Sequence, residues 1–264
     1  RIIQVDIDPV MLSNNYKNDL SIAGDVFLVL KDLYKELQGL GCRPDSTPWS
    51  QQINQIRKKF WQDSITQLQS NDIPIKPQRV INAVNEALLE PSIVISDAGT
   101  PTPYITRFLR LKGKGSRFII PRAFGGLGYA IPAVVGAFLA RPDAKIIGMF
   151  GDGSLGMSAG ELETLVRLNV HAILIHFNNG SFGWIKALQS IHSQGRFMSV
   201  DFTQGNMAAV ATAFGIKSFH VKTPDELDHA FNEAIAYQGP VFIDVVTEPE
   251  VIELPPVYSW HHAK

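Results

Sequence analysis

The stretch from residue 145 to residue 184 constrains the fold more than any other, because each of its two apolar runs ends in polar residues. Residues 145–150 predict a buried parallel strand that ends in Gly-Asp-Gly-Ser at 151–154. Residues 171–177 predict a second strand that ends in Asn-Asn-Gly at 178–180. Because a helix is expected between them, both strand ends should lie at one edge of a parallel sheet, where ligands of open α/β folds bind.

The two strand ends carry the oxygen ligands that Mg²⁺ prefers. Asp152 can supply a carboxylate oxygen, Asn179 an amide oxygen and Ser181 a backbone carbonyl. The remaining positions of an octahedron would go to two diphosphate oxygens and a water. Gly151 and Gly153 let the backbone approach a diphosphate, and amides near Ser154 favour an anion.

Two motifs carry a resemblance to a known family. The first is GDG at 151–153, followed after twenty-four residues by the pair of asparagines at 178–179. The second is GGLGYAIPA at 125–133, which is similar to a GGLGxxxPA segment. Together, and in this order, they resemble thiamine-diphosphate-dependent enzymes of the acetolactate synthase and benzoylformate decarboxylase branch, specifically the C-terminal portion.

The resemblance implies thiamine diphosphate and Mg²⁺ as cofactors. It makes Asp152, Asn179 and Ser181 the metal ligands. It places Leu127 under the bend of the cofactor, with the Gly125 carbonyl accepting a hydrogen bond from the cofactor's amino group. The implied cofactor-binding residues are Gly99, Thr100, Thr102, Gly125, Leu127, Gly151, Asp152, Gly153, Ser154, Asn179, Ser181 and Phe182.

The loop that begins at Asp97 follows another predicted strand at the same sheet edge. Gly99, Thr100 and Thr102 are expected to contact the diphosphate through amides and hydroxyls. Two prolines, at 101 and 103, remove amides there, which departs from an ideal anion loop. Asp97 itself is equally well explained as a helix cap.

Candidates for the substrate wall lie after the second asparagine. Phe182, Trp184 and Leu188 are expected beside the metal, and Trp184 is our candidate for substrate selection. Acetolactate synthases tend to carry methionine where Trp184 stands and tryptophan where Leu188 stands. These two departures weaken an assignment to acetolactate synthase itself. The side chains of Phe182 and Trp184 can equally serve only in packing.

Three further polar residues are ambiguous. His176 lies inside an apolar strand, where a hydrogen-bonded core histidine is the better interpretation. His192 is a more plausible pocket residue. Arg122, just before the glycines, can bind a carboxylate or form a surface ion pair.

The resemblance also implies an activating glutamate, carried by the pyrimidine-binding domain of a partner subunit. We assign that role to no acid of this sequence, and interpret Glu161 and Glu163 as helix-capping and helix-surface residues. The implied assembly is a homodimer or homotetramer whose active sites are shared between subunits. FAD is possible in a full-length protein and cannot be judged from this sequence.

Composition excludes several other classes. The net charge of −1 gives no basic field for nucleic acid or an anionic membrane. No apolar run approaches the ~20 residues that span a bilayer, and no signal peptide opens the chain. The single cysteine, Cys42, is expected to be a loop thiol. We expect a cytoplasmic protein.

The predicted fold class is α/β, a doubly wound parallel sheet with helices on both faces, preceded by a remnant of another α/β domain. Residues 1–38 are expected to end a middle domain, 39–76 to form a linker with a helix near 49–68, 77–250 to bind the diphosphate and metal, and 251–264 to form a tail. Ser158 and Glu161 predict a capping box for the helix of the central unit. The other predicted helices are 25–37, 77–89, 102–111, 128–139, 206–214 and 224–237, with Thr223 as a cap, and the other strands are 1–8, 92–96, 117–120, 216–221 and 241–246.

Two functions follow as hypotheses. The first is a decarboxylase or carboligase acting on a 2-oxo acid. The alternative is a fragment or relative that binds thiamine diphosphate and lacks turnover. A nicotinamide-binding Rossmann domain is excluded by spacing, because Ile131 stands where the third glycine of that fingerprint belongs.

Overall fold

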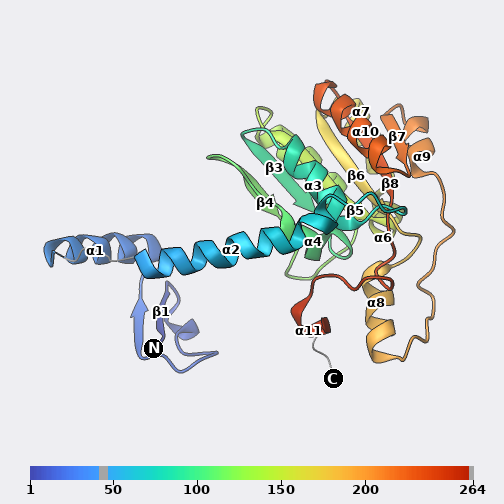
Figure 1. The fold of residues 1–264 in the computed structure, drawn as a ribbon. Helices are drawn as coiled ribbons and strands as arrows, with labels where there is room; N and C mark the ends of the chain where they lie inside the picture. Colours follow the sequence, from blue (N-terminus) through green and yellow to red (C-terminus); the bar gives the residue numbers. More distant parts are fainter. Residues whose placement is uncertain (42–46, 262–264) are drawn as a thin grey trace. The chain divides into compact units, whose positions relative to one another are not determined.

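The computed structural model describes residues 1–41 and 47–261 (Figure 1). Packing of the Cα atoms divides the chain into two units, Arg1–Gln62 and Asp63–Lys264, which are described separately. The predicted domain boundaries at residues 38 and 76 flank this division and stay a prediction. Cys42 and His262, which we predicted to lie in a loop and in a tail, are outside the described residues.

The first unit contains two short parallel strands and two helices. Strand β1 (Ile3–Asp6) pairs with β2 (Leu20–Ala23), and a 3-10 turn, η1 (Pro9–Met11), lies between them. Helix α1 (Val26–Gly39) confirms the helix expected at 25–37; the Asp25 side chain caps it, and it buries none of its residues. Helix α2 (Thr47–Leu68) confirms the helix expected near 49–68. Strand β2 was not predicted. It has only four residues, of which one is half-buried, and so short a run shows no clear alternation of apolar and polar residues that would indicate a strand.

The second unit is built on a six-stranded parallel sheet with the order β4-β3-β5-β6-β8-β7. This confirms the predicted doubly wound sheet. The four inner strands β3, β5, β6 and β8 are buried throughout or nearly so, whereas the edge strands β4 and β7 are partly exposed. The strands are β3 (Ser92–Ser96), β4 (Arg117–Ile119), β5 (Lys145–Gly151), β6 (Ala172–Asn178), β7 (Lys217–Val221) and β8 (Val241–Val246).

Helices cover both faces of this sheet (Figure 1). One face carries α3 (Pro77–Ala87), α4 (Pro101–Phe108) and α10 (Pro224–Ala236), and the other carries α5 (Ala130–Ala140), α6 (Asp152–Ser158), α7 (Glu161–Arg167) and α9 (Met207–Ala213). Two helices lie beyond the strand ends, α8 (Gly183–His192) and α11 (Tyr258–His261). Within the described ranges, no helix has both the length and the hydropathy to cross a membrane.

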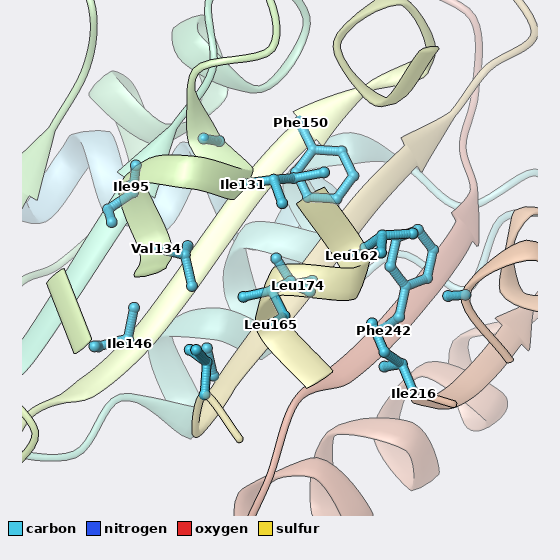
Figure 2. Close-up of a cluster of buried hydrophobic side chains, with 14 of the residues drawn as sticks. Ile95, Ile131, Val134, Ile146, Phe150, Leu162, Leu165, Leu174, Ile216 and Phe242 are labelled. Atoms are coloured by element: carbon cyan, nitrogen blue, oxygen red, sulfur yellow. The ribbon is translucent and has the colours of Figure 1, made fainter. Parts of the chain in front are cut away.

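A hydrophobic core fills the space between the sheet and the α5 side (Figure 2). Ile131 from α5 and Leu162 from α7 pack over Phe150 and Phe242 of the sheet, and all four are buried. Full burial of such a side chain contributes about 1.5–3 kcal/mol each, so this layer fixes the strand ends in place.

The chain reverses direction across the sheet between β3 and β5. After β3 it moves outward to β4, and then it returns to form β5 on the other side of β3. Ser96 pairs with Met149, and the amide of Asp97 donates to the Met149 carbonyl at 2.8 Å. The loops that leave β3 and β5 therefore diverge from neighbouring strand ends, which creates the crevice where such sheets bind ligands.

The predicted capping box at Ser158 and Glu161 was wrong. Helix α6 begins at Asp152, directly after β5, so Ser158 lies in its last turn and donates to the Ser154 carbonyl at 3.0 Å. Glu161 opens the separate helix α7 and accepts a hydrogen bond from Thr164. Because the chain passes from β5 into α6 at Gly151, the start of this helix lies seven positions before Ser158, which therefore cannot cap it. The predicted cap at Thr223 is confirmed, and there it forms a full capping box with Glu226.

Candidate functional site

A cavity of about 470 Å³ opens at the carboxyl edge of the sheet, at the crevice between β3 and β5. Four segments form its wall, namely the loop after β3, the glycine segment 125–128 with the residues just before it, the turn after β5, and the segment after β6. Of the residues that the resemblance implies for the cofactor and metal, all except Thr102 and Asn179 line it, and so does the substrate-wall candidate Trp184: Gly99, Thr100, Gly125, Leu127, Gly151, Asp152, Gly153, Ser154, Ser181, Phe182 and Trp184.

Asp152 is the first residue of α6, and its side chain is only 10% exposed. One carboxylate oxygen accepts the backbone amide of Asn179 at 3.2 Å, which joins the ends of β5 and β6. The other oxygen lies 3.5 Å from Nε2 of His176. Burial raises the pKa of the Asp152 carboxyl, and His176 and the Asn179 amide oppose that rise. A cation beside this carboxylate would therefore stabilise its charged form.

Asn179 lies directly behind the cavity wall and is 8% exposed. Its Oδ1 accepts hydrogen bonds from the Ser181 amide at 3.0 Å and the Ser181 hydroxyl at 3.1 Å. Ser181 also forms an antiparallel bridge with Asp201. The two hydrogen bonds beside this bridge use the Gly180 carbonyl and the Phe182 amide, so the bridge does not use the Ser181 carbonyl.

The loop after β3 is tied to the glycine segment by Asp97. This fully buried carboxylate accepts the amide of Ala130, the first residue of α5, and its own neighbour Ala98, both at 3.0 Å. Burial raises the pKa of Asp97 despite these bonds. Asp97 does not cap α4, the helix that follows it, whose start at Thr100 has no side-chain cap hydrogen bond; it binds the first amide of α5 instead. The Thr102 hydroxyl turns back to the Asp97 carbonyl at 2.9 Å, whereas Thr100 lines the cavity.

The glycine segment 125–128 depends on backbone conformations that favour glycine. Gly125 and Gly128 have φ values of 64° and 84°. A Cβ on Gly128 would also lie 3.2 Å from Cβ of Met157 in α6. The segment therefore passes close to α6, and it presents the half-buried Leu127 to the cavity.

A family model for the C-terminal TPP-binding domain of thiamine pyrophosphate enzymes matches residues 97–245, which is more than half of the chain. The chain belongs to this family. Thiamine pyrophosphate is the thiamine diphosphate of the resemblance above. The matched region runs from the loop after β3 into β8 and contains every residue that lines the cavity.

Known relatives agree with this assignment. The chain is 30% identical over 256 residues to a probable acetolactate synthase large subunit of Methanocaldococcus jannaschii, with 94% of this chain and 42% of that protein covered. It is 29% identical over 248 residues to a pyruvate oxidase of Lactiplantibacillus plantarum, covering 92% and 40%. It is 26% identical over 247 residues to a benzoylformate decarboxylase of Pseudomonas aeruginosa, covering 94% and 44%. The chain spans about two fifths of the length of these relatives.

The residues of this thiamine pyrophosphate enzyme domain suit Mg²⁺ shared with a diphosphate. Among the residues that the structure describes, no three His, Cys, Asp or Glu side chains gather to hold a metal by themselves. Asp152 and the Asn179 segment are joined by a hydrogen bond, and Gly153 is packed so closely against the Phe182 ring that a Cβ would overlap it. One carboxylate, one amide and a backbone carbonyl beside a glycine-lined cavity fit a cation that takes its other ligands from phosphate.

Glu250 is a site residue that the sequence did not reveal. It follows β8, is 2% exposed, and its Oε2 accepts a hydrogen bond from Nδ2 of Asn179 at 2.7 Å. Burial raises the pKa of Glu250 to about 6, with a further contribution from the charge of Asp152. Its other oxygen, Oε1, is buried without a partner in the described part of the chain. Glu250 is the last residue of the region 77–250 that we expected to bind the diphosphate and metal, and nothing in the pattern there indicates its burial.

His176 is a hydrogen-bonded core histidine, as predicted. Its Nδ1 lies 2.9 Å from Oδ1 of Asp244, which also accepts Nδ2 of Asn178 at 3.0 Å. The other Asp244 oxygen contacts Nδ1 of His220 at 2.8 Å and accepts the Met207 amide at 2.8 Å. Burial would raise the pKa of Asp244, but these hydrogen bonds outweigh it and hold the pKa below its ordinary value.

The aromatic candidates lie at the cavity wall. Trp184 is in the first turn of α8, and its ring contacts that of Trp260 with centroids 4.5 Å apart. The Phe182 ring similarly contacts Phe202 at 4.6 Å. Arg122 lines the cavity, whereas Leu188 and His192 do not. Residue 260 belongs to the predicted tail, so the segment after β8 returns to the wall of the cavity.

Proposed function

We propose that this chain supplies the Mg²⁺- and diphosphate-binding part of a thiamine-diphosphate-dependent enzyme that acts on a 2-oxo acid, as a decarboxylase or carboligase. The observation that carries the proposal is the meeting of Asp152 and Asn179, whose carboxylate and backbone amide are joined at 3.2 Å beside the cavity. Family membership and the names of the relatives support the class of reaction.

In this proposal the metal ligands are Asp152, Asn179 and Ser181. Asp152 gives a carboxylate oxygen, Asn179 gives Oδ1 and Ser181 gives its backbone carbonyl. Two diphosphate oxygens complete most of the octahedron. Gly151, Gly153 and Ser154 border the cavity where the diphosphate would lie, and Gly99 and Thr100 line it beside them. Thr102 acts indirectly here, because its hydroxyl supports the loop after β3.

The glycine segment has a different task. When bound, thiamine diphosphate supplies a carbon nucleophile for the substrate carbonyl and accepts the electrons that departing CO₂ leaves behind. Leu127 would support the bent cofactor from beneath, and the Gly125 carbonyl would accept a hydrogen bond from its amino group. Trp184 and Phe182 would form a wall that excludes water and selects the side chain of the substrate.

A homo-oligomer with a shared active site is part of the proposal. Phe124 is fully exposed and Ile185 is 47% exposed, although both line the cavity. Large apolar side chains at a ligand site are usually covered by a ligand or a partner. A second copy would supply that cover, and light scattering of the purified protein would measure its mass.

The test is product analysis after supplying thiamine diphosphate and Mg²⁺. Pyruvate alone is compared with pyruvate plus an aldehyde or a second 2-oxo acid. Release of CO₂ with an aldehyde product indicates a decarboxylase, and a longer hydroxyketone that forms only with the acceptor indicates a carboligase. Absence of any Mg²⁺-dependent binding of thiamine diphosphate would contradict the proposal.

The alternative, a thiamine-diphosphate-binding protein without turnover, predicts a different result. Thiamine diphosphate would bind in the presence of Mg²⁺, and no 2-oxo acid would release CO₂. The same assay therefore separates the two functions, provided that cofactor binding is measured by calorimetry in the same preparation.

A further inference from the structure

Glu250 approaches the site from a direction that the proposed function does not use. The strand ends supply Asp152 and Asn179, whereas Glu250 comes from the segment after β8. That segment is anchored by the Thr247 amide, which donates to the Asn178 carbonyl at 3.0 Å. The anchor places a nearly fully buried carboxylate against the side chain of Asn179, at 2.7 Å from its Nδ2.

The contact selects one of the two orientations of the Asn179 carboxamide. Nδ2 points to Oε2 of Glu250 and lies 3.4 Å from the Thr100 hydroxyl, while Oδ1 points to Ser181. A rotation of the amide by half a turn would place its oxygen against the Glu250 carboxylate, where two acceptors repel. A buried acceptor facing another acceptor costs about 1–3 kcal/mol.

Gly183 makes room for this contact. It is the first residue of α8, and a Cβ there would overlap both Oε2 of Glu250 and Nδ2 of Asn179. The glycine at this helix start therefore has a specific use, which is to let the carboxylate and the carboxamide meet beneath the helix.

We propose that Glu250 is a positioning residue for the metal site, which holds Nδ2 of Asn179 so that Oδ1 faces the cation. The inference rests on the proposed function, because it assigns Asn179 to the metal. Partners that orient metal ligands in this way are usually worth 10–100-fold in metal affinity. Glu250 touches neither the cofactor nor the substrate in this account.

The experiment measures thiamine diphosphate binding by calorimetry, once with Mg²⁺ and once with a chelator. Glu250→Ala is expected to lower the Mg²⁺-dependent affinity by about 10–100-fold and to leave binding in chelator unchanged. Glu250→Gln keeps an acceptor oxygen and is expected to retain most of the wild-type affinity. Gly183→Ala should separate the two side chains and reproduce the selective loss. The control is Glu253→Gln, three residues along, whose carboxylate pairs with Lys76.

A second measurement tests the contact without any cofactor. The side-chain amide protons of Asn179 are followed by hydrogen exchange in nitrogen-15 spectra, and Glu250→Ala is expected to speed their exchange. Unchanged exchange, an unchanged Mg²⁺-dependent affinity, or an equal loss with and without Mg²⁺ would each overturn the proposal. If wild-type protein fails to bind thiamine diphosphate but Asn179 exchange still depends on Glu250, the proposed function fails while the contact stands.

Discussion

The two sides of the cavity are built differently. On the side of the proposed metal site, called the metal side below, Asp152 and Asn179 are 90% or more buried. The buried Glu250 accepts a hydrogen bond from Asn179, and Nε2 of the buried His176 lies 3.5 Å from Asp152. On the opposite side, the glycine segment 125–128 is held by the Asp97 carboxylate, and the neighbouring Phe124 is fully exposed.

This difference indicates that the fold alone sets the geometry of the metal side, whereas the geometry of the glycine segment depends on a bound ligand or partner. Strand ends locked by a six-stranded sheet can hold charged ligands in place before any cation arrives, which lowers the cost of binding. An exposed glycine segment has few contacts of its own, so its final geometry depends on what covers it. We therefore expect changes on the metal side to affect cofactor affinity and changes on the glycine side to affect turnover.

The largest effect is expected from Asp152→Ala, which removes the only charged ligand of the proposed set. Because partners of metal ligands are already worth about 10–100-fold, loss of a ligand should weaken Mg²⁺-dependent binding of thiamine diphosphate by more than about 100-fold. Calorimetry measures this. Asp143→Ala is the matched control, because Asp143 pairs with Arg141 at the surface. Tight binding by Asp152→Ala would remove this residue from the metal.

Asp244→Asn tests the buried support beneath the metal side. The variant replaces a carboxylate that accepts hydrogen bonds from five groups, so about 3 kcal/mol of folding free energy should be lost, as when a buried charge pair loses one partner. Urea unfolding measures the loss. If the free energies of unfolding of the variant and the wild type differ by less than the experimental error, the hydrogen bonds of Asp244 do not stabilise the fold.

The same variant has an expected pH dependence. The folded-state pKa of Asp244 lies below its ordinary value of 3.8, so its contribution is present above pH 3.8 and disappears as the pH falls through the folded-state pKa. Wild type should therefore lose stability in acid, and the gap to Asp244→Asn should close there. A gap that widens in acid would show that the sign is wrong.

Leu127→Ala tests the glycine side. Loss of the supporting side chain should lower kcat by roughly ten-fold, which corresponds to about 1.4 kcal/mol in the transition state, while cofactor affinity changes less. Steady-state kinetics and calorimetry are measured on the same preparation. A loss of cofactor affinity with an unchanged kcat would place Leu127 in cofactor binding alone and would remove the contrast between the two sides.

Trp184→Ala is expected to have the smallest effect. It should change the ratio of kcat/KM between two 2-oxo acids of different side-chain size by about ten-fold or less, because pocket shape alone discriminates weakly. Trp49→Ala is the control, since that tryptophan is exposed in the first unit. An unaltered ratio would mean that Trp184 only packs against Trp260.

The sequence predicted the sheet, and the meeting of Asp152 with Asn179 at its edge, because both depend on local signals. An apolar run followed by Asp152 or Asn179 indicates the end of a strand. The alternation of predicted strands with predicted helices along the chain indicates a parallel sheet. His176 was likewise expected to be satisfied within its strand. These features need only the order of residues along the chain.

Features that depend on distant contacts were missed or wrong. Burial of Glu250 follows from the pairing of β8 with β6, in which Asn178 faces Val246, and no periodicity of its own segment indicates this. Helix α6 begins at Asp152 because the chain turns from strand to helix without a spacer, so the signature at Ser158 had no helix start to cap. The helical form of residues 183–192 also escaped notice.

The most direct test of the central claim is a crystal structure with thiamine diphosphate and Mn²⁺, which replaces Mg²⁺ and can be located by its anomalous scattering. We predict one metal ion at about 2.1 Å from oxygens of Asp152, Asn179 and Ser181, with diphosphate oxygens opposite them. A metal bound elsewhere, or a diphosphate that lies away from Gly151 and Gly153, would contradict the assignment of this sheet edge as the cofactor site.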